Sequence, residues 1–194
     1  MSVSVHEITS DELDEYSSVS IAYEVLTILQ PQQIDDGLGG LRLSEEPVKV
    51  PYVKDYDTYR DGPPERWLQR FDTRNWGFLV ARDEGRTVGG ATIAYDTPGV
   101  LWGEGRRDLT VLWDLRVQIG RRRGGVGSIL FDHAVEWTRK RGCKRMKIET
   151  QNVNVPACRF YAKHGCHLGN IDRYGYVGSP HVAHEVMLIW YFDL

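Results

Sequence analysis

The sequence predicts an α/β protein in which a mixed sheet is flanked by helices. The first half contains strand-like runs, and the second half alternates strand, helix, strand, helix and strand, a succession typical of such a sheet. Apolar residues make up 41% of the chain, enough to build a sizeable core. The length of 194 residues suits one domain, so we expect a single domain spanning residues 1–194.

The N-terminal part is expected to begin with an edge strand at Val3–Ile8, where apolar and polar residues partly alternate. Thr9 and Ser10 precede acidic residues in the manner of a helix cap, and apolar positions continue at helical spacing. A helix is therefore expected over 10–29. Residues 31–62 carry prolines, glycines and mixed charge without a sustained period. We expect either a substrate-binding loop or a disordered insertion there.

The elements after this segment follow clearer patterns. A proline pair is typical of a helix start, and a polar turn of five residues predicts a hairpin. A basic, glycine-rich turn then separates a strand from a helix with one apolar face. The expected elements are a helix at 63–71, strands at 76–81, 87–95 and 109–117, a helix at 125–141, a strand at 144–150, a helix at 155–164, and strands at 167–171 and 185–192.

The charge and composition exclude some functions. A formal net charge of −3 argues against a nucleic-acid-binding protein, which usually needs a basic surface. The longest apolar run, 186–192, is far shorter than the ~20 residues that span a membrane. The N-terminus lacks the pattern of a secretory signal, and the three cysteines form no disulfide framework. We therefore expect a cytoplasmic protein that binds neither nucleic acid nor membrane.

The glycine-rich turn is the first candidate binding site. Backbone N–H groups at a helix N-terminus attract anions, and glycines let a phosphate approach the backbone. No Lys-Ser/Thr pair follows the last glycine, and the glycines do not form the G-x-G-x-x-G pattern of dinucleotide binding. An ordinary strand–helix turn with solvated arginines is the alternative interpretation. The residues expected to hold a diphosphate are Arg122, Arg123, Gly124, Gly125, Val126, Gly127 and Ser128.

A second motif follows about two dozen residues later. Asn154, Ala157, Tyr161 and Gly165 are spaced so that the asparagine precedes a helix carrying the alanine and the tyrosine. Asn154 makes physical sense as an N-cap with a proline in the first turn. It could serve only as a cap, and Tyr161 could be only a core aromatic residue.

Both motifs, in this order, resemble the GNAT family of N-acetyltransferases. The first matches the family's R/Q-x-x-G-x-G/A turn at Arg122, Gly125 and Gly127. The segments 149–151 and 154–161, together with 168–172 and 189–191, are similar to the streptothricin acetyltransferase subgroup. The resemblance covers residues 75–194 well and 1–74 poorly, with 51–57 the fainter match in that half. Cys166 stands where the family usually has an aromatic residue.

This resemblance implies the GNAT acyl-CoA N-acyltransferase fold and acetyl-CoA as co-substrate. No metal is expected, because no carboxylate or cysteine completes a familiar site around the histidine pairs 164/167 and 181/184. Backbone N–H groups of Leu115, Arg116 and Val117 would polarise the thioester, and residues 122–128 would bind the pyrophosphate. Asn154 and Ala157 would contact the cofactor, with the asparagine at the pantetheine arm. Tyr161 would contact the cofactor and be the general acid for the departing thiolate.

The general base is left open between two carboxylates. A primary amine has a pKa near ~10, so a proton must leave before it can attack. Asp114 is expected on the strand before the glycine-rich turn, and Glu149 on the following strand. Either could act directly or through water. Alternatively, Asp114 is a satisfied strand aspartate and Glu149 a solvated or salt-bridged glutamate.

The function expected from these features is acetyl transfer from acetyl-CoA to a primary amine of a small molecule, by direct attack in a ternary complex. A streptothricin-type antibiotic is the expected acceptor, with a role in antibiotic resistance. A protein or peptide N-acetyltransferase and a non-catalytic acyl-CoA-binding domain are the alternatives. The resemblance also suggests a homodimer.

Overall fold

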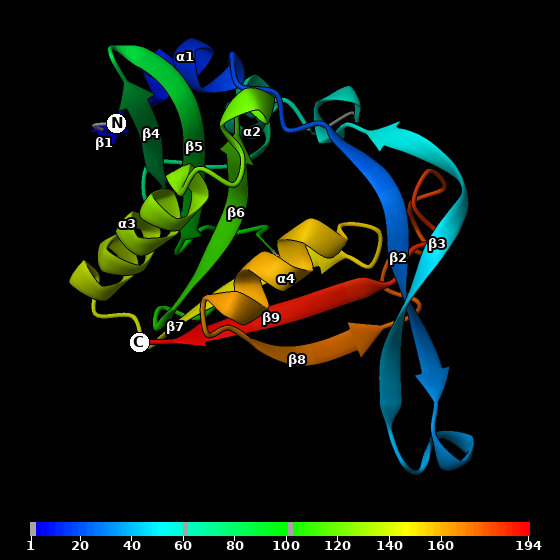
Figure 1. Cartoon of the computed structure of the whole chain (residues 1–194). Coiled ribbons are helices and arrows are strands. Elements are labelled where there is room, and N and C mark those ends of the chain that lie inside the picture. The colour runs from blue at the N-terminus through cyan, green and yellow to red at the C-terminus, as the bar shows by residue number, and fades with distance from the viewer. Residues whose placement is uncertain (1–2, 60–61, 101–102) are drawn as a thin grey trace. The chain divides into compact units, whose positions relative to one another are not determined.

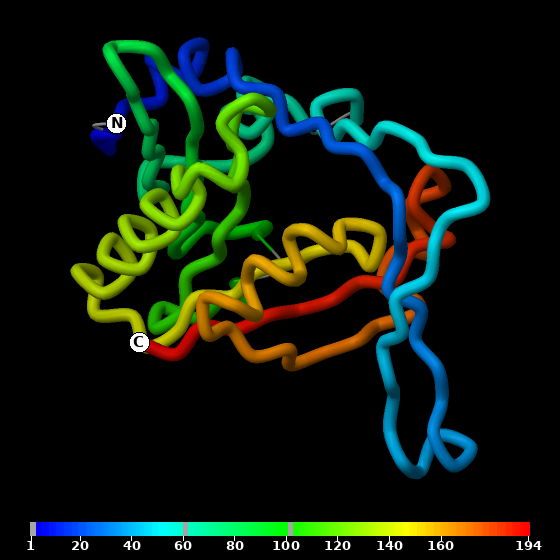
Figure 2. The backbone as a smooth tube through the Cα atoms, viewed as in Figure 1, coloured from blue at the N-terminus to red at the C-terminus, as the bar shows by residue number. Residues whose placement is uncertain are grey.

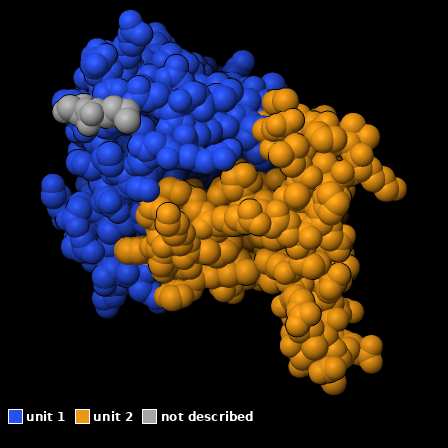
Figure 3. All heavy atoms as spheres, viewed as in Figure 1, with its two compact units in different colours: residues 1–23, 55–147, 193–194 blue, residues 24–54, 148–192 orange. Residues whose placement is uncertain are grey.

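A computed structural model describes residues 3–59, 62–100 and 103–194 (Figure 1). Figure 2 traces the path of the backbone, and Figure 3 colours two compact units. Unit 1 consists of residues 1–23, 55–147 and 193–194, whereas unit 2 consists of residues 24–54 and 148–192. Each unit therefore collects segments that are far apart in the sequence.

Unit 1 is built on an antiparallel set of strands. β1 (Val3–Ile8) pairs with β4 (Gly77–Asp83), β4 with β5 (Arg86–Tyr95), and β5 with β6 (Leu109–Val117). The hairpin between β4 and β5 turns at residues 84–85, both in the left-handed region that such tight turns require. In the order β1-β4-β5-β6 the β4–β5 hairpin is therefore central, with β1 beside β4 and β6 beside β5.

The helices of unit 1 cover this sheet. They are α1 (Leu13–Ser17), α2 (Pro64–Arg70) and α3 (Val126–Lys140), and α3 lies against β4, β5 and β6 (Figure 1). Short 3-10 turns lie at Ser10–Glu12, Tyr56–Thr58 and Ile119–Arg121. Aromatic side chains fill much of the core near α1 and α2. The buried face of α3 consists of Val126, Leu130, Phe131, Ala134, Val135, Trp137 and Thr138.

Unit 2 contains its own sheet strands and one helix. β7 (Arg145–Gln151) enters this unit at residue 148, and the strand order is β7-β9-β8. β8 (His167–Asp172) and β9 (Met187–Asp193) are antiparallel. α4 (Val155–Lys163) follows β7 and packs near β8.

The three cysteines of the chain are buried, and none forms a disulfide.

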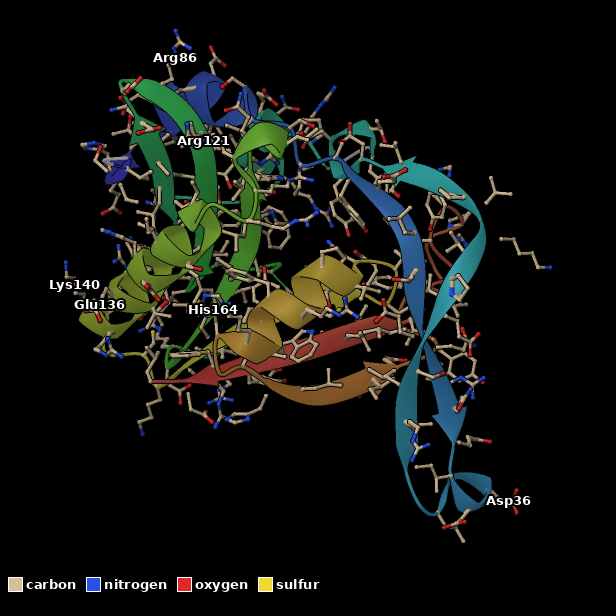
Figure 4. The ribbon with its side chains drawn as sticks, in the orientation of Figure 1. Asp36, Arg86, Arg121, Glu136, Lys140 and His164 are labelled. Atoms are coloured by element: carbon tan, nitrogen blue, oxygen red, sulfur yellow. The ribbon has the colours of Figure 1, made fainter. Side chains whose placement is uncertain are left out.

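A long hairpin of β2 (Tyr23–Gln33) and β3 (Leu41–Lys54) forms a separate two-stranded sheet. Its tip includes the 3-10 turn Asp35–Gly37, and Figure 4 shows Asp36 at this end. The hairpin is held within unit 2 by reciprocal hydrogen bonds between Leu29 and Asn152, of 2.9 and 3.0 Å.

The hairpin corrects two expectations. The helix predicted over 10–29 ends at Ser17, and within the described part of 31–62 residues 31–33 and 41–54 are strand. Most side chains of β2 and β3 are exposed or partly exposed on both faces. A strand without a buried face needs no alternation of apolar and polar residues, so the usual sequence signal is missing.

The other elements lie within a few residues of their predicted bounds, and the α/β class with helices beside a sheet is confirmed. Among the described residues, no helix is long and apolar enough to cross a membrane. The assignment of residues 1–194 to one domain stays a prediction.

Candidate active site

The turn before α3 has the geometry of an anion-binding helix start. Gly125 is the N-cap residue, with φ of 88°, and Ile129 donates the first intrahelical bond to its carbonyl at 3.1 Å. The amide groups of 126–128 therefore belong to the first turn, where N–H groups point out of the helix end. A Cβ at Gly125 would meet no atom within 4 Å. The positive φ of this residue, and not a lack of space, therefore favours glycine. Arg123 beside it is exposed, with φ of 63°.

The other two arginines of this turn are committed to the protein itself. Arg121, labelled in Figure 4, forms a salt bridge with Asp83. Arg122 donates to the carbonyl oxygens of Val117 at 2.9 Å and Ala22 at 2.7 Å. Burial lowers the pKa of Arg122. These contacts fix the turn to β4 and to the end of β6. Binding of a pyrophosphate by residues 122–128 stays a prediction.

Asp114 lies in a buried network of unit 1. Its Oδ1 accepts from the Tyr16 hydroxyl at 2.5 Å and from Arg116 Nε at 2.9 Å, and its Oδ2 accepts from Arg116 Nη2 at 2.9 Å. The Arg116 side chain is fully buried and also contacts both oxygens of Asp57 at 3.0 and 3.1 Å. Both oxygens of Asp114 are occupied, which favours the interpretation of a satisfied strand aspartate.

The proposed thioester-polarising segment lies beside an irregularity of β6. Leu115, Arg116 and Val117 pair with residues 91, 90 and 89 of β5. The register shifts just before them, because Thr92 pairs with Asp114 whereas the next residue pairs with Leu112. Bulges of this kind bend a strand and often lie next to active sites. The role of the Leu115, Arg116 and Val117 amides as oxyanion donors stays a prediction.

Glu149 has a different environment, in unit 2. The Tyr176 hydroxyl donates to its Oε1, and Gln151 Nε2 donates to the same oxygen at 3.2 Å. Burial raises the pKa of Glu149 to about 7, and the negative charge of Glu185 adds to this, whereas Lys54 opposes it. A carboxyl group that titrates near neutral pH is suited to general base catalysis.

A buried ion pair lies close to this carboxylate. Lys54 at the end of β3 and Glu185 before β9 form a salt bridge, and each side chain is 3% exposed. Burial lowers the pKa of Lys54, and its hydrogen bond to Glu185 opposes that shift. Neither residue of this pair was predicted as a site residue from the sequence, nor was Tyr176. Only Lys54 had a signal, since it lies in the segment 51–57 that faintly resembles the subgroup.

The second motif lies on α4. Asn154 is the N-cap, and its side-chain oxygen accepts from the Ala157 amide at 3.2 Å. The capping interpretation of Asn154 is confirmed. The Tyr161 side chain is buried, and its ring packs edge-on against Phe160 at 5.4 Å between centroids. Contacts of Asn154, Ala157 and Tyr161 with a cofactor stay predictions.

No group of three or more His, Cys, Asp or Glu side chains in the described part of the chain is arranged to hold a metal ion.

The chain matches the model of the Acetyltransferase (GNAT) family over residues 44–166, more than half of its length, and belongs to that family. The resemblance inferred from the two motifs is therefore confirmed.

Three curated proteins are similar to parts of the chain. The chain is 37% identical over 79 residues to streptothricin acetyltransferase A from Bacillus subtilis (strain 168), covering 41% of this chain and 45% of that protein. It is 38% identical over 85 residues to the Escherichia coli streptothricin acetyltransferase, covering 44% and 49%. These two matches thus span about half of each relative. The Streptomyces lavendulae streptothricin acetyltransferase is 28% identical over 147 residues, covering 76% and 74%.

Solved structures confirm the fold. A proposed streptothricin acetyltransferase from Bacillus anthracis str. Ames, in complex with acetyl coenzyme A, matches with a TM-score of 0.77, 23% identity and full coverage of both chains. A nourseothricin acetyltransferase matches with a TM-score of 0.75 and 22% identity, covering 100% of this chain and 99% of the other.

Proposed function

We propose that this chain transfers the acetyl group of acetyl-CoA to a primary amine of a small molecule, with a streptothricin-type antibiotic as the acceptor. Membership of the GNAT family supports the reaction class, and three relatives named as streptothricin acetyltransferases support the acceptor. We assign the reaction to the cytoplasm and the protein to antibiotic resistance.

The environment of Glu149 is the observation that carries the proposal. A general base must be ionised often enough to accept a proton, yet basic enough to remove one. Burial raises the pKa of Glu149 to about 7, which meets both needs at neutral pH. Both hydrogen bonds to Glu149 among the described residues end on Oε1, so Oε2 is directed toward the acceptor in this proposal. Glu149 is therefore our choice of base over Asp114.

The steps follow from these residues. Glu149 takes a proton from the substrate ammonium, and the neutral nitrogen attacks the thioester carbon. The new C–N bond forms as the C–S bond breaks, and the amine's second proton is lost to water. Tyr161 gives a proton to the departing thiolate, so the products are an amide and a free thiol. Amide groups of the first turn of α3 are assigned to the pyrophosphate.

Thiol release tests this function. The purified chain is mixed with acetyl-CoA and streptothricin, polyamines, aminoglycosides or lysine-containing peptides. We expect turnover with streptothricin and a large loss of rate in Tyr161→Phe. Turnover restricted to peptides would move the chain to the protein acetyltransferases. Acetyl-CoA binding without turnover on any amine would favour a non-catalytic domain, and sedimentation would test the proposed homodimer.

A further inference from the structure

The loop between β8 and β9 is fixed inward at one side chain. Residues 173–181 are exposed, apart from Tyr176, whose relative exposure is 9%. Its ring is therefore the buried anchor of a segment that otherwise faces solvent. The Tyr176 hydroxyl donates to Glu149 Oε1, so this anchor ends on the proposed base and not on a backbone group.

The backbone beside Tyr176 is shaped for this contact. A Cβ at Gly175 would lie 3.0 Å from Met187 Cβ and 2.7 Å from Met187 Cε on β9. A side chain at Gly175 would therefore push the loop away from β9. The Tyr176 carbonyl accepts from the Ser179 amide at 2.8 Å, which closes a turn directly after it. Both features hold the Tyr176 ring at a fixed place in the loop.

Within the described part of the chain, both hydrogen bonds to Glu149 end on the same oxygen. Tyr176 and Gln151 are neutral donors, and both act on Oε1. A carboxylate held at one oxygen by two donors cannot rotate without losing both bonds, so the other oxygen keeps one direction. We propose that Tyr176 is a positioning residue: its hydroxyl holds Glu149 so that Oε2 receives the proton of the substrate amine. This proposal rests on the function proposed above.

The charges around Glu149 determine how this proposal is tested. Lys54 from β3 and Glu185 from the segment before β9 act on it in opposite directions, and Cys158 of α4 is close enough to be influenced by its charge. Tyr52 of β3 is influenced by Glu185 in turn. A hydrogen bond to the ionised carboxylate lowers its pKa, so removing the Tyr176 hydroxyl is expected to raise the pKa of Glu149 further.

A purely structural role for Tyr176 gives a different result. If the ring only anchors the loop, loss of the hydroxyl lowers stability or overall rate equally at every pH. If the hydroxyl positions the base, kcat falls and its pH dependence moves while the KM for acetyl-CoA stays the same. The neighbouring Tyr174, which is 74% exposed in the same loop, provides a matched control.

The test measures thiol release from pH 5.5 to 9 for the wild type, Tyr176→Phe and Tyr174→Phe, with acetyl-CoA and the amine that gives turnover. We expect kcat of Tyr176→Phe to fall about tenfold, the loss of one hydrogen bond to a charged group. The rising limb of its profile moves to higher pH. Tyr174→Phe keeps the wild-type profile. An unmoved limb, or equal changes in both variants, overturns the proposal.

A second readout does not need turnover. Carboxyl-labelled glutamate, assigned with Glu149→Gln, follows the titration of Glu149 by NMR. We expect this titration at higher pH in Tyr176→Phe, and an unchanged titration overturns the proposal even if the rate falls. If the wild type acetylates no amine, the proposed function fails, while this titration still decides whether Tyr176 holds Glu149. Gly175→Ala, which keeps the hydroxyl but displaces the loop, is expected to move the titration in the same direction by less.

Discussion

The two carboxylates that the sequence offered as bases lie in contrasting surroundings. Asp114 in unit 1 has both oxygens bound, and its main partner is the fully buried guanidinium of Arg116. Glu149 in unit 2 is bound through one oxygen by two neutral donors. A guanidinium that binds both oxygens makes Asp114 part of a buried network, whereas the two neutral donors of Glu149 leave its pKa at about 7. The hydrogen-bond partners of a carboxylate therefore decide its role more than whether it is an aspartate or a glutamate.

The largest expected effect comes from removing the Glu149 carboxylate. Glu149→Gln should lower kcat about 10²- to 10⁴-fold at neutral pH, the usual contribution of a general base. Stability should not fall, because folding raises the pKa of Glu149 from 4.5 to about 7 and ionisation above that range costs stability. Thiol release and thermal unfolding at pH 8 measure the two quantities. Nearly unchanged kcat would remove Glu149 as the base.

Asp114→Asn should give the reverse result. The buried guanidinium of Arg116 would lose a charged partner, which is expected to lower the free energy of unfolding by about 3 kcal/mol. Asp57 still contacts Arg116 and limits the loss. Urea unfolding measures the change, and kcat per folded molecule should stay within a few-fold of wild type. A folded variant without turnover would move the base to Asp114.

A smaller effect, of known sign, is expected at the buried ion pair. The negative charge of Glu185 helps to raise the pKa of Glu149, so Glu185→Gln should lower that pKa and move the rising limb of kcat/KM to lower pH. This is opposite to the shift expected for Tyr176→Phe. Rate profiles are compared at a temperature where both variants remain folded. A shift in the same direction for both would show that loop disruption, and not charge, controls the profile.

The smallest effect is expected at the turn before α3. Arg123→Asn removes an exposed positive charge while keeping a residue type that tolerates positive φ, and should raise the KM for acetyl-CoA about threefold. The effect should shrink as salt is added. Arg86→Asn, at an exposed arginine of β5, is the matched control (Figure 4). An equal change in both variants would contradict a specific role for Arg123.

Helices and strands whose apolar residues mark their buried positions could be predicted from the sequence. β1 and β6 have the predicted bounds: the apolar residues of β1 are its least exposed, and β6 is buried along most of its length. β2 and β3 were missed because neither has a consistently buried face. Such strands look like loops in a pattern based on hydrophobicity.

The parts of the candidate site that depend only on nearby residues could be predicted from the sequence. The turn before α3 and the cap at Asn154 are set by neighbours within a few residues. The surroundings of Glu149 depend on Lys54 and Glu185, which are 131 positions apart, and on a tyrosine in an irregular loop. No local spacing carries such information, so the choice between Glu149 and Asp114 needed the contacts themselves.

The burial of the cysteines has a practical consequence for every rate measurement above. Burial raises the pKa of Cys158 to about 11 and of Cys166 to about 12, and it also raises the pKa of Cys143. These thiols are therefore almost entirely protonated at neutral pH and react slowly with disulfide reagents. A chromogenic reagent that captures the thiol product as it forms can remain in the cuvette, and the protein's mass after such an assay should be unchanged. A single cysteine placed at position 38, which is 96% exposed, would then be the one rapidly labelled site for a fluorophore.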